Sequence, residues 1–325
     1  MLPNYKFFHL TMLGIVAMAA VLCLYAEQAD AARCLYVSSY HKGYEWNDGI
    51  ERGIESVIDG RCELERFYMD TKQHPETAWA EQKALEATKL IRQLKPDVVI
   101  VADDNASRYL VKPHFRDSPI PFVFCGLNWT IEEYGYPYKN TTGMVEVTPI
   151  KPLLKQIRNV IPTAKTGIFI SASVATEYKE FDHYKKILAR EGIVLLGQLV
   201  NTMAEWEAAY KQAQRYDFII LSNYAGITGW DKTRAAKVAL NNARTLTVGT
   251  YDWMMPYVAF ALTKVPEEQG EWAARVALAV LDGLSPQEIP VIPNRRWQVW
   301  INPVIIQKLG ITLPKSLVLN ARVYK

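Results

Sequence analysis

The sequence predicts an α/β protein of two Rossmann-like lobes, each built on a parallel sheet, joined by a multi-strand hinge. Short apolar runs alternate with amphipathic stretches along most of the chain. Within each of two groups the runs begin 23 to 33 residues apart, so each interval accommodates one helix and two short connections. The chain of 325 residues is also longer than one typical hydrophobic core requires, which favours two domains.

Eight apolar runs are expected to be strands, four in each lobe. They are residues 34–38, 64–68, 97–101 and 120–124, then 166–170, 193–198, 217–221 and 246–248. The stretches between them carry apolar residues every three or four positions, which predicts helices. One such stripe is Val174, Tyr178, Phe181, Tyr184 and Leu188.

The chain after residue 248 is expected to cross back between the lobes. Residues 253–262 and 270–281 are expected to be helices, and 297–301 a last strand. Residues 140–149 contain no long Gly/Ser linker and are expected to connect the lobes directly. The expected division is a leader at 1–31, a first lobe at 32–146 with 255–288, and a second lobe at 147–254 with 289–325.

The first residues predict export. Lys6 precedes an apolar stretch from residue 10 to 26, and Ala29-Asp30-Ala31 is a small-x-small cleavage pattern. We expect cleavage after Ala31 and a periplasmic mature protein. The alternative is a retained anchor, because the stretch is about the minimum length that spans a bilayer.

Three cysteines remain after cleavage: Cys34, Cys62 and Cys125. If the runs that Cys34 and Cys62 open are neighbouring parallel strands, both thiols lie at the same end of the sheet. We therefore expect a Cys34–Cys62 disulfide, with two buried thiols as the alternative. Cys125 lies in an apolar run and is interpreted as a small core residue.

Composition and missing motifs exclude several function classes. The 37 Lys and Arg nearly balance the 34 Asp and Glu, so no nucleic-acid partner is expected. The sequence has no G-x-G-x-x-G, no phosphate-binding P-loop, no G-x-S-x-G and no H-E-x-x-H. Its histidines show no metal-ligand spacing. We expect no cofactor, no metal and no enzymatic activity.

Polar and aromatic residues follow the predicted strands, where ligands bind in open α/β sheets. Hydroxyls and helix-start N–H groups suit a carboxylate, aspartates suit an ammonium, and rings offer flat apolar walls. The alternatives are core packing for each ring and helix capping for Asp104 or Asn105. The candidate ligand-binding residues are Tyr40, His41, Tyr44, Trp46, Asp103, Asp104, Asn128, Trp129, Ser171, Ser173, Tyr224, Tyr251 and Asp252.

Five segments resemble one known family. They are YVSSYHKGYEWNDGI at 36–50, PDVVIVADDNA at 96–106, IPFVFCGLN at 120–128, TGMVE at 142–146 and the tail at 301–314. They resemble the ABC-transporter substrate-binding proteins of the tryptophan/tyrosine-receptor type. The resemblance implies a type I periplasmic-binding-protein fold and ligand capture by lobe closure, without chemistry. The variant Ser-Tyr-His-x-Gly-Tyr-x-Trp at 39–46 also resembles versions that serve sensor histidine kinases.

The expected function is capture of a small organic ligand and its delivery to an ABC permease. An aromatic amino acid is the first choice, with Ser171 and Ser173 on its carboxylate and Asp252 on its ammonium. A sensor histidine kinase is the alternative partner. The alternative from another class is a two-lobe enzyme, which strongly perturbed carboxylates facing each other across the cleft would favour.

Overall fold

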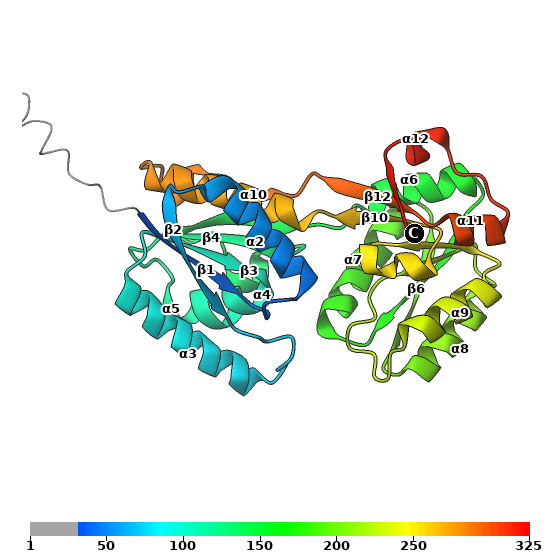
Figure 1. Cartoon of the computed structure of the whole chain (residues 1–325), viewed down its shortest axis with the longest axis horizontal. Coiled ribbons are helices and arrows are strands. Elements are labelled where there is room, and N and C mark those ends of the chain that lie inside the picture. The colour runs from blue at the N-terminus through cyan, green and yellow to red at the C-terminus, as the bar shows by residue number, and fades with distance from the viewer. Residues whose placement is uncertain (1–31) are drawn as a thin grey trace, which may run out of the picture.

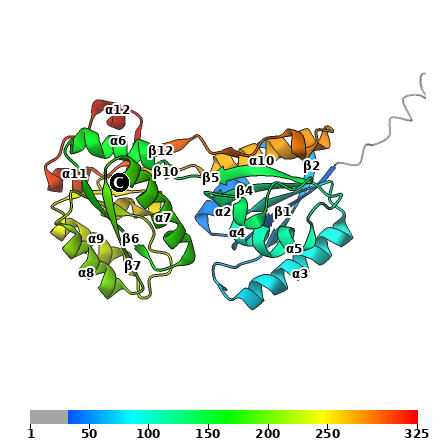
Figure 2. The ribbon, with the colours of Figure 1, turned by 180° about the vertical axis from the view of Figure 1, so that it is seen from behind.

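The computed structural model describes residues 32–325 as two α/β lobes that lie side by side (Figures 1 and 2). The first sheet has the order β11-β5-β4-β3-β1-β2, and the second β13-β12-β10-β9-β8-β6-β7. Strand pairs are parallel, apart from the antiparallel pair β10–β12. The predicted fold class is confirmed. The expected leader, residues 1–31, lies outside the described residues.

The first lobe contains both the start of the chain and a late segment. Its strands are β1 (Ala32–Ser38), β2 (Cys62–Tyr68), β3 (Val98–Ala102), β4 (Phe122–Asn128), β5 (Thr141–Glu146) and β11 (Ile292–Pro293). Its helices are α2 (Glu45–Ile58), α3 (Thr77–Leu94), α4 (Asp103–Asn105), the π-helix η1 (Ala106–Val111), α5 (Lys112–His114), η2 (Glu132–Tyr134), α10 (Pro266–Leu281) and η4 (Pro286–Glu288).

The second lobe contains the middle of the chain and its end. Its strands are β6 (Thr166–Ala172), β7 (Val194–Val200), β8 (Phe218–Leu221), β9 (Leu246–Gly249), β10 (Phe260–Lys264), β12 (Trp297–Ile301) and β13 (Ala321–Val323). Its helices are α6 (Ile150–Val160), α7 (Ala175–Arg190), α8 (Met203–Ala213), α9 (Lys232–Asn242), η3 (Asp252–Tyr257), α11 (Pro303–Leu309) and α12 (Lys315–Val318).

Helices cover both faces of each sheet, which explains why β3 and β8 are apolar at every position. In the first lobe, α3 and η1 pack on one face and α2 with α10 on the other. The contact between α2 and α10 depends on two glycines. A Cβ atom at Gly53 or at Gly270 would collide with the backbone of the other helix.

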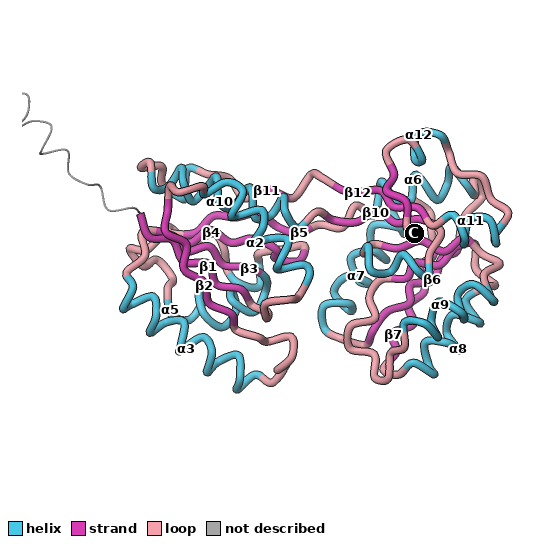
Figure 3. Tube along the Cα trace, in the orientation of Figure 1, coloured by secondary structure: helices cyan, strands magenta, loops and turns pink. Residues whose placement is uncertain are grey.

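The chain crosses between the lobes three times within the described residues: between β5 and α6, between β10 and α10, and between β11 and β12. In Figure 3 these crossings run along one edge of the space between the lobes. They form the expected multi-strand hinge.

Two element predictions were wrong. Residues 253–262 form no regular α-helix: η3 is followed by β10, which pairs with β9 and β12. The stretch is apolar throughout, so it has no helical period, and Pro256 interrupts it. Residues 140–149 are not only a connection, because they contain β5. The chain returns to the first lobe after Lys264 rather than at 255, and leaves it again after Pro293 rather than at 289.

A disulfide joins Cys34 on β1 to Cys62 on β2, with 5.9 Å between their Cα atoms. The two strands are parallel neighbours, so both residues lie at the same end of the sheet. Cys125 is a free, buried thiol. Among residues 32–325 no helix is both long enough and apolar enough to cross a membrane.

Candidate ligand-binding site

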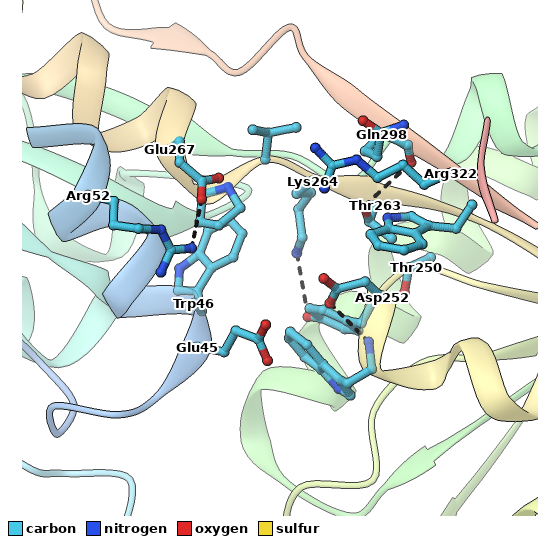
Figure 4. Close-up of a pocket in the computed structure, with 15 residues that line it drawn as sticks. Glu45, Trp46, Arg52, Thr250, Asp252, Thr263, Lys264, Glu267, Gln298 and Arg322 are labelled. Atoms are coloured by element: carbon cyan, nitrogen blue, oxygen red, sulfur yellow. Dashed lines mark hydrogen bonds and ion pairs between the residues drawn. The ribbon is translucent and has the colours of Figure 1, made fainter. Parts of the chain in front are cut away.

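A cavity of ≈ 330 Å³ lies between the lobes beside the hinge (Figure 4). We call it the hinge-side cavity. Trp46 reaches it from the start of α2 in the first lobe. Tyr251 and Trp253 reach it from the loop after β9, and Trp300 from β12. Four aromatic rings from both lobes therefore wall one space.

Charged groups without ion-pair partners face the same cavity. Arg52 and Glu267 neutralise each other at 2.7 Å. Asp252, Glu45 and Arg322 form no ion pair within 4.0 Å in the described part of the chain. Arg322 instead lies over the ring of Trp300, 5.4 Å from its centroid. The cavity thus offers two carboxylates and one guanidinium to a ligand.

Burial affects two polar groups of this cavity. It raises the pKa of Asp252, although hydrogen bonding to the Trp253 backbone and the charge of Arg322 oppose the rise. The hydroxyl of Thr250 is buried and has no hydrogen-bond partner among the described residues. A buried polar atom without a partner is costly unless something binds it. Thr250 is therefore a second indication that the cavity accepts a ligand.

A much smaller space of ≈ 30 Å³, the central space, lies deeper between the strand ends. It shares Trp46, Tyr251 and Trp253 with the hinge-side cavity. Room of this size admits about one water molecule. Its remaining walls come from both lobes: Tyr40, Tyr44, Lys72, Asp103, Asn128 and Glu146 from the first, and Thr176, Glu177, Glu180 and Asn223 from the second.

The buried carboxylate of Asp103 in the central space has protein partners. It accepts hydrogen bonds from Asn47 Nδ2 at 2.6 Å and from Trp46 Nε1 at 3.2 Å. Burial raises its pKa, although the bond from Asn47 opposes the rise. Its backbone has φ +68°, and a Cβ atom on neighbouring Gly126 would lie 2.9 Å from Asp103 Oδ1. The β4 glycine makes room for this strained aspartate.

The other carboxylates of the central space also have partners. Glu146 and Glu180 both contact the ammonium of Lys264, Glu180 at 3.5 Å. Glu177 accepts a hydrogen bond of 2.6 Å from Ser171 Oγ. Burial raises the pKa of Glu177 and raises that of Glu146 to about 7, although Lys264 opposes the latter rise. Perturbed carboxylates therefore do face each other across the cleft, but each is bound by another protein group.

The outer mouth of the cleft is a cavity of ≈ 550 Å³ bridged by ion pairs. Lys179 of α7 contacts Glu133 of the first lobe at 2.6 Å and Asp104 at 3.7 Å. The ammonium of Lys72 lies over the rings of Tyr40 and Tyr44, at 4.8 and 5.3 Å. The lobes are thus in contact on the side away from the hinge.

Most of the predicted site residues lie in these spaces. The hinge-side cavity, the central space, the mouth and a side cavity of ≈ 180 Å³ beside Trp253 together include nine of them. These are Tyr40, Tyr44, Trp46, Asp103, Asp104, Asn128, Tyr224, Tyr251 and Asp252.

Four predicted residues have other contacts. His41 faces Asp70 at 3.4 Å. Trp129 stacks on His183 of α7, with 4.5 Å between ring centroids. Ser171 is fully buried and bonded to Glu177, and the Ser173 hydroxyl lies 3.0 Å from that of Tyr178. None of these four residues lines a cavity described above.

The capping alternative for Asp104 and Asn105 is wrong, because the helical run already begins at Asp103. Asp104 instead accepts hydrogen bonds from Asn128 at 2.6 Å and from Tyr134.

Sequence reasoning missed the charged residues Lys72, Glu146, Glu177, Glu180 and Lys264. A signal for two of them was present in α7. Glu177 and Glu180 stand three positions apart and continue to Tyr184 and Leu188, which is the spacing of the buried face. Tyr178, which had been assigned to that face, is 54% exposed. Carboxylates at helical core spacing indicate a buried polar site.

A family model described as ABC transporter substrate binding protein matches residues 67–325. The chain belongs to the ABC-transporter substrate-binding protein family. A comparison with curated proteins finds no match. The segment 36–50, which suggested this family first, lies before the matched range.

Solved structures share the fold of this substrate-binding protein. One is an ABC domain from Streptococcus pneumoniae in complex with L-Trp, at 17% identity and TM-score 0.64, covering 90% of this chain and 99% of that one. A ligand-free, open substrate-binding protein with adhesive properties from Clostridium difficile has 15% identity and TM-score 0.67, with the same coverage. A solute-binding protein from Agrobacterium vitis with bound D-fucose has 12% identity and TM-score 0.55, covering 82% and 94%. At these identities the likeness shows the fold alone.

Proposed function

We propose that this periplasmic protein captures an aromatic amino acid in the hinge-side cavity and delivers it to an ABC permease. The observation that carries the proposal is the combination of four rings with the unpaired Asp252 and Arg322 around ≈ 330 Å³. Rings supply the walls for an aromatic side chain. The opposite charges suit a zwitterion, because each ligand charge needs a partner once water is excluded.

Asp252 binds the ammonium in this proposal, as the sequence predicted, but the partner of the carboxylate changes. Ser171 lies on β6 and Asp252 follows β9, and β8 separates these strands. Strands two positions apart are about 10 Å apart. The ammonium and carboxylate of an amino acid are attached to one carbon and do not span that distance. Arg322, which lines the same cavity as Asp252, is the better partner.

Titration calorimetry with L-tryptophan, L-tyrosine and L-phenylalanine tests the ligand. We expect the parent to bind at least one of them, and Asp252→Ala to weaken binding by about 2–5 kcal/mol. Asp282→Ala, an exposed aspartate paired with Arg61, is the matched control and should bind like the parent.

Two results would correct the proposal in different ways. If the parent binds none of the three amino acids, the ligand is not one of them, and the protein is a binding protein for another solute. If Asp252→Ala binds as well as the parent and Asp103→Ala does not, the ammonium lies in the central space.

The partner is tested by crosslinking the protein in intact cell envelopes, followed by mass spectrometry. Permease subunits are expected. The opening segment 39–46 resembles versions that serve sensor histidine kinases, so kinase peptides in place of permease peptides would establish the alternative partner.

The two-lobe enzyme remains the candidate from another class, because carboxylates with raised pKa do face the central space. A general acid or base needs a proton that it can exchange with a substrate. Asp103, Glu146 and Glu177 are instead bound by Asn47, Lys264 and Ser171. Recovery of the calorimetric ligand chemically unchanged, checked by mass spectrometry, is expected for a binding protein.

A further inference from the structure

Lys264 occupies an unusual place in the hinge. It is the last residue of β10, directly before the chain crosses to α10 in the first lobe. Only 1% of its side chain is exposed. Lysine is almost never so deeply buried unless it is paired. The groups that pair with Lys264 therefore indicate the role of this buried charge.

The partners of Lys264 come from both lobes. From the first lobe, Glu146 at the end of β5 contacts the ammonium, and the ring of Trp46 lies 5.6 Å away. From the second lobe, Glu180 lies at 3.5 Å, and Tyr251 contributes its hydroxyl at 3.4 Å and its ring at 4.9 Å. One hinge cation thus contacts a carboxylate and an aromatic ring of each lobe.

Electrostatic interactions stabilise this arrangement of the two lobes. Burial alone would lower the pKa of Lys264, but Glu146 and Glu180 outweigh it and the pKa is raised. The lysine is therefore charged at every physiological pH. Above about pH 7, where Glu146 is ionised, a lobe rotation that separates it from Lys264 leaves two charges without their closest partner, at a cost that only water entry reduces. The cluster consequently favours one angle between the lobes.

The rest of the hinge connects the crossing segments to one another. Asn294 Oδ1 accepts a hydrogen bond of 2.6 Å from Val147 N, which joins the third crossing to the first. Glu268 accepts from the backbone of Arg295 and Arg296, both at 2.8 Å, which joins the third crossing to the start of α10. These bonds join hinge segments, whereas Lys264 also reaches the rings Trp46 and Tyr251 that line the cleft.

We propose that Lys264 is the positioning residue that sets the angle between the lobes and the spacing of the cleft walls Trp46 and Tyr251. This role does not depend on which ligand binds, because it rests on contacts within the protein. Lys264 would act before ligand arrives, by holding the two walls at a fixed separation. Preorganisation of this kind reduces the cost of binding.

Interlobe distances in the ligand-free, full mature chain test the proposal. Spin labels on cysteines introduced at the exposed positions Glu81 and Lys211, one in each lobe, report the distance by double electron–electron resonance. The parent should give one narrow distribution. Lys264→Met should lower the fraction of molecules at the parent distance about ten-fold. Lys186→Met is the matched control, since its ion pair with Asp182 lies on the surface of α7.

A second variant covers the case in which Lys264→Met does not fold. Glu146→Gln removes the ion pair between the lobes and leaves Lys264 with Glu180, and it should also broaden the distribution. The proposal is overturned if a folded Lys264→Met keeps the narrow parent distribution. It is equally overturned if Lys264→Met does not fold and Glu146→Gln is narrow, or if the parent is already as broad as Lys264→Met.

Discussion

The hinge-side cavity and the central space lie at the same strand ends and share three aromatic residues, yet they differ in kind. The hinge-side cavity has ≈ 330 Å³ and charged groups without partners. The central space has ≈ 30 Å³, and its carboxylates are bound by Asn47, Lys264 and Ser171. Charged residues in a cleft therefore do not by themselves mark a ligand site. Those that already have partners hold the protein together, and those without partners are available to a ligand.

The largest effect should come from breaking the central cluster at Lys264. Lys264→Met leaves Glu146 and Glu180 buried without their cation, and we expect a loss of about 3–5 kcal/mol in the free energy of unfolding. Urea denaturation measures it. Lys186→Met removes a pair whose side chains are 63% and 56% exposed and should cost no more than about 1 kcal/mol. Equal losses in the two variants would show that the central cluster is not structural.

The next effect is a dependence of stability on pH. Burial raises the pKa of Glu146 from its ordinary value of 4.5 to about 7. Between these pH values the unfolded chain has released this proton and the folded chain retains it. The free energy of unfolding therefore falls by about 3 kcal/mol as pH rises through this window, from this group alone. Asp103 and Glu177, whose pKa values burial also raises, act in the same direction.

Denaturation curves at several pH values check this dependence. Glu146→Gln cannot titrate at this position, so its curve should be flatter between pH 4.5 and 7 than that of the parent. A curve of unchanged slope would place the titration elsewhere.

The smallest expected effect is the difference in stability between two variants, each lacking one aspartate, one from the central space and one from the hinge-side cavity. Asp103→Ala leaves Trp46 Nε1 without its acceptor and Asn47 Nδ2 with only Ser38 Oγ, and it should cost about 1–3 kcal/mol of stability. Asp252→Ala should change stability by no more than about 0.5 kcal/mol, because Asp252 is only part-buried and accepts its hydrogen bond from the backbone N–H of the adjacent Trp253. Thermal or urea unfolding of the two variants, measured together, tests this difference. If Asp252→Ala is the less stable variant, the roles assigned to the two aspartates are reversed.

The fold could be predicted from the sequence because parallel strands buried on both faces must be apolar runs at regular intervals. The strands that were missed show the limit of this argument. β5 begins with Thr141 and Thr142, and β10 lies in an apolar stretch with no period, so neither is distinguished locally from its surroundings. Both segments form strands because they pair with neighbouring strands, β5 with β4 and β10 with β9. Such pairing depends on the rest of the sheet and is not visible in the local sequence.

The site could be predicted only where strand ends define it. The ends of β3, β4 and β9 place Asp103, Asn128 and Asp252 along the central space and the hinge-side cavity. Lys264 and Glu146 could not be found in this way, because they lie at the hinge, and only the crossing of distant segments brings them together. Ser171 was placed at the correct strand end, but its hydroxyl faces Glu177, whose position depends on how α7 packs.

The contact between α2 and α10 has a consequence for how the chain reaches its folded state. Synthesis delivers the N-terminal part first, but the first lobe includes α10 and β11, which are encoded more than two hundred residues later than α2. Until α10 emerges, the face of the first sheet that packs against Ala273 and Ala277 is covered by α2 alone. Neither lobe is a continuous segment, so a nascent chain cannot complete one before beginning the other. Folding of both lobes must therefore conclude together, once the C-terminal strands have been made.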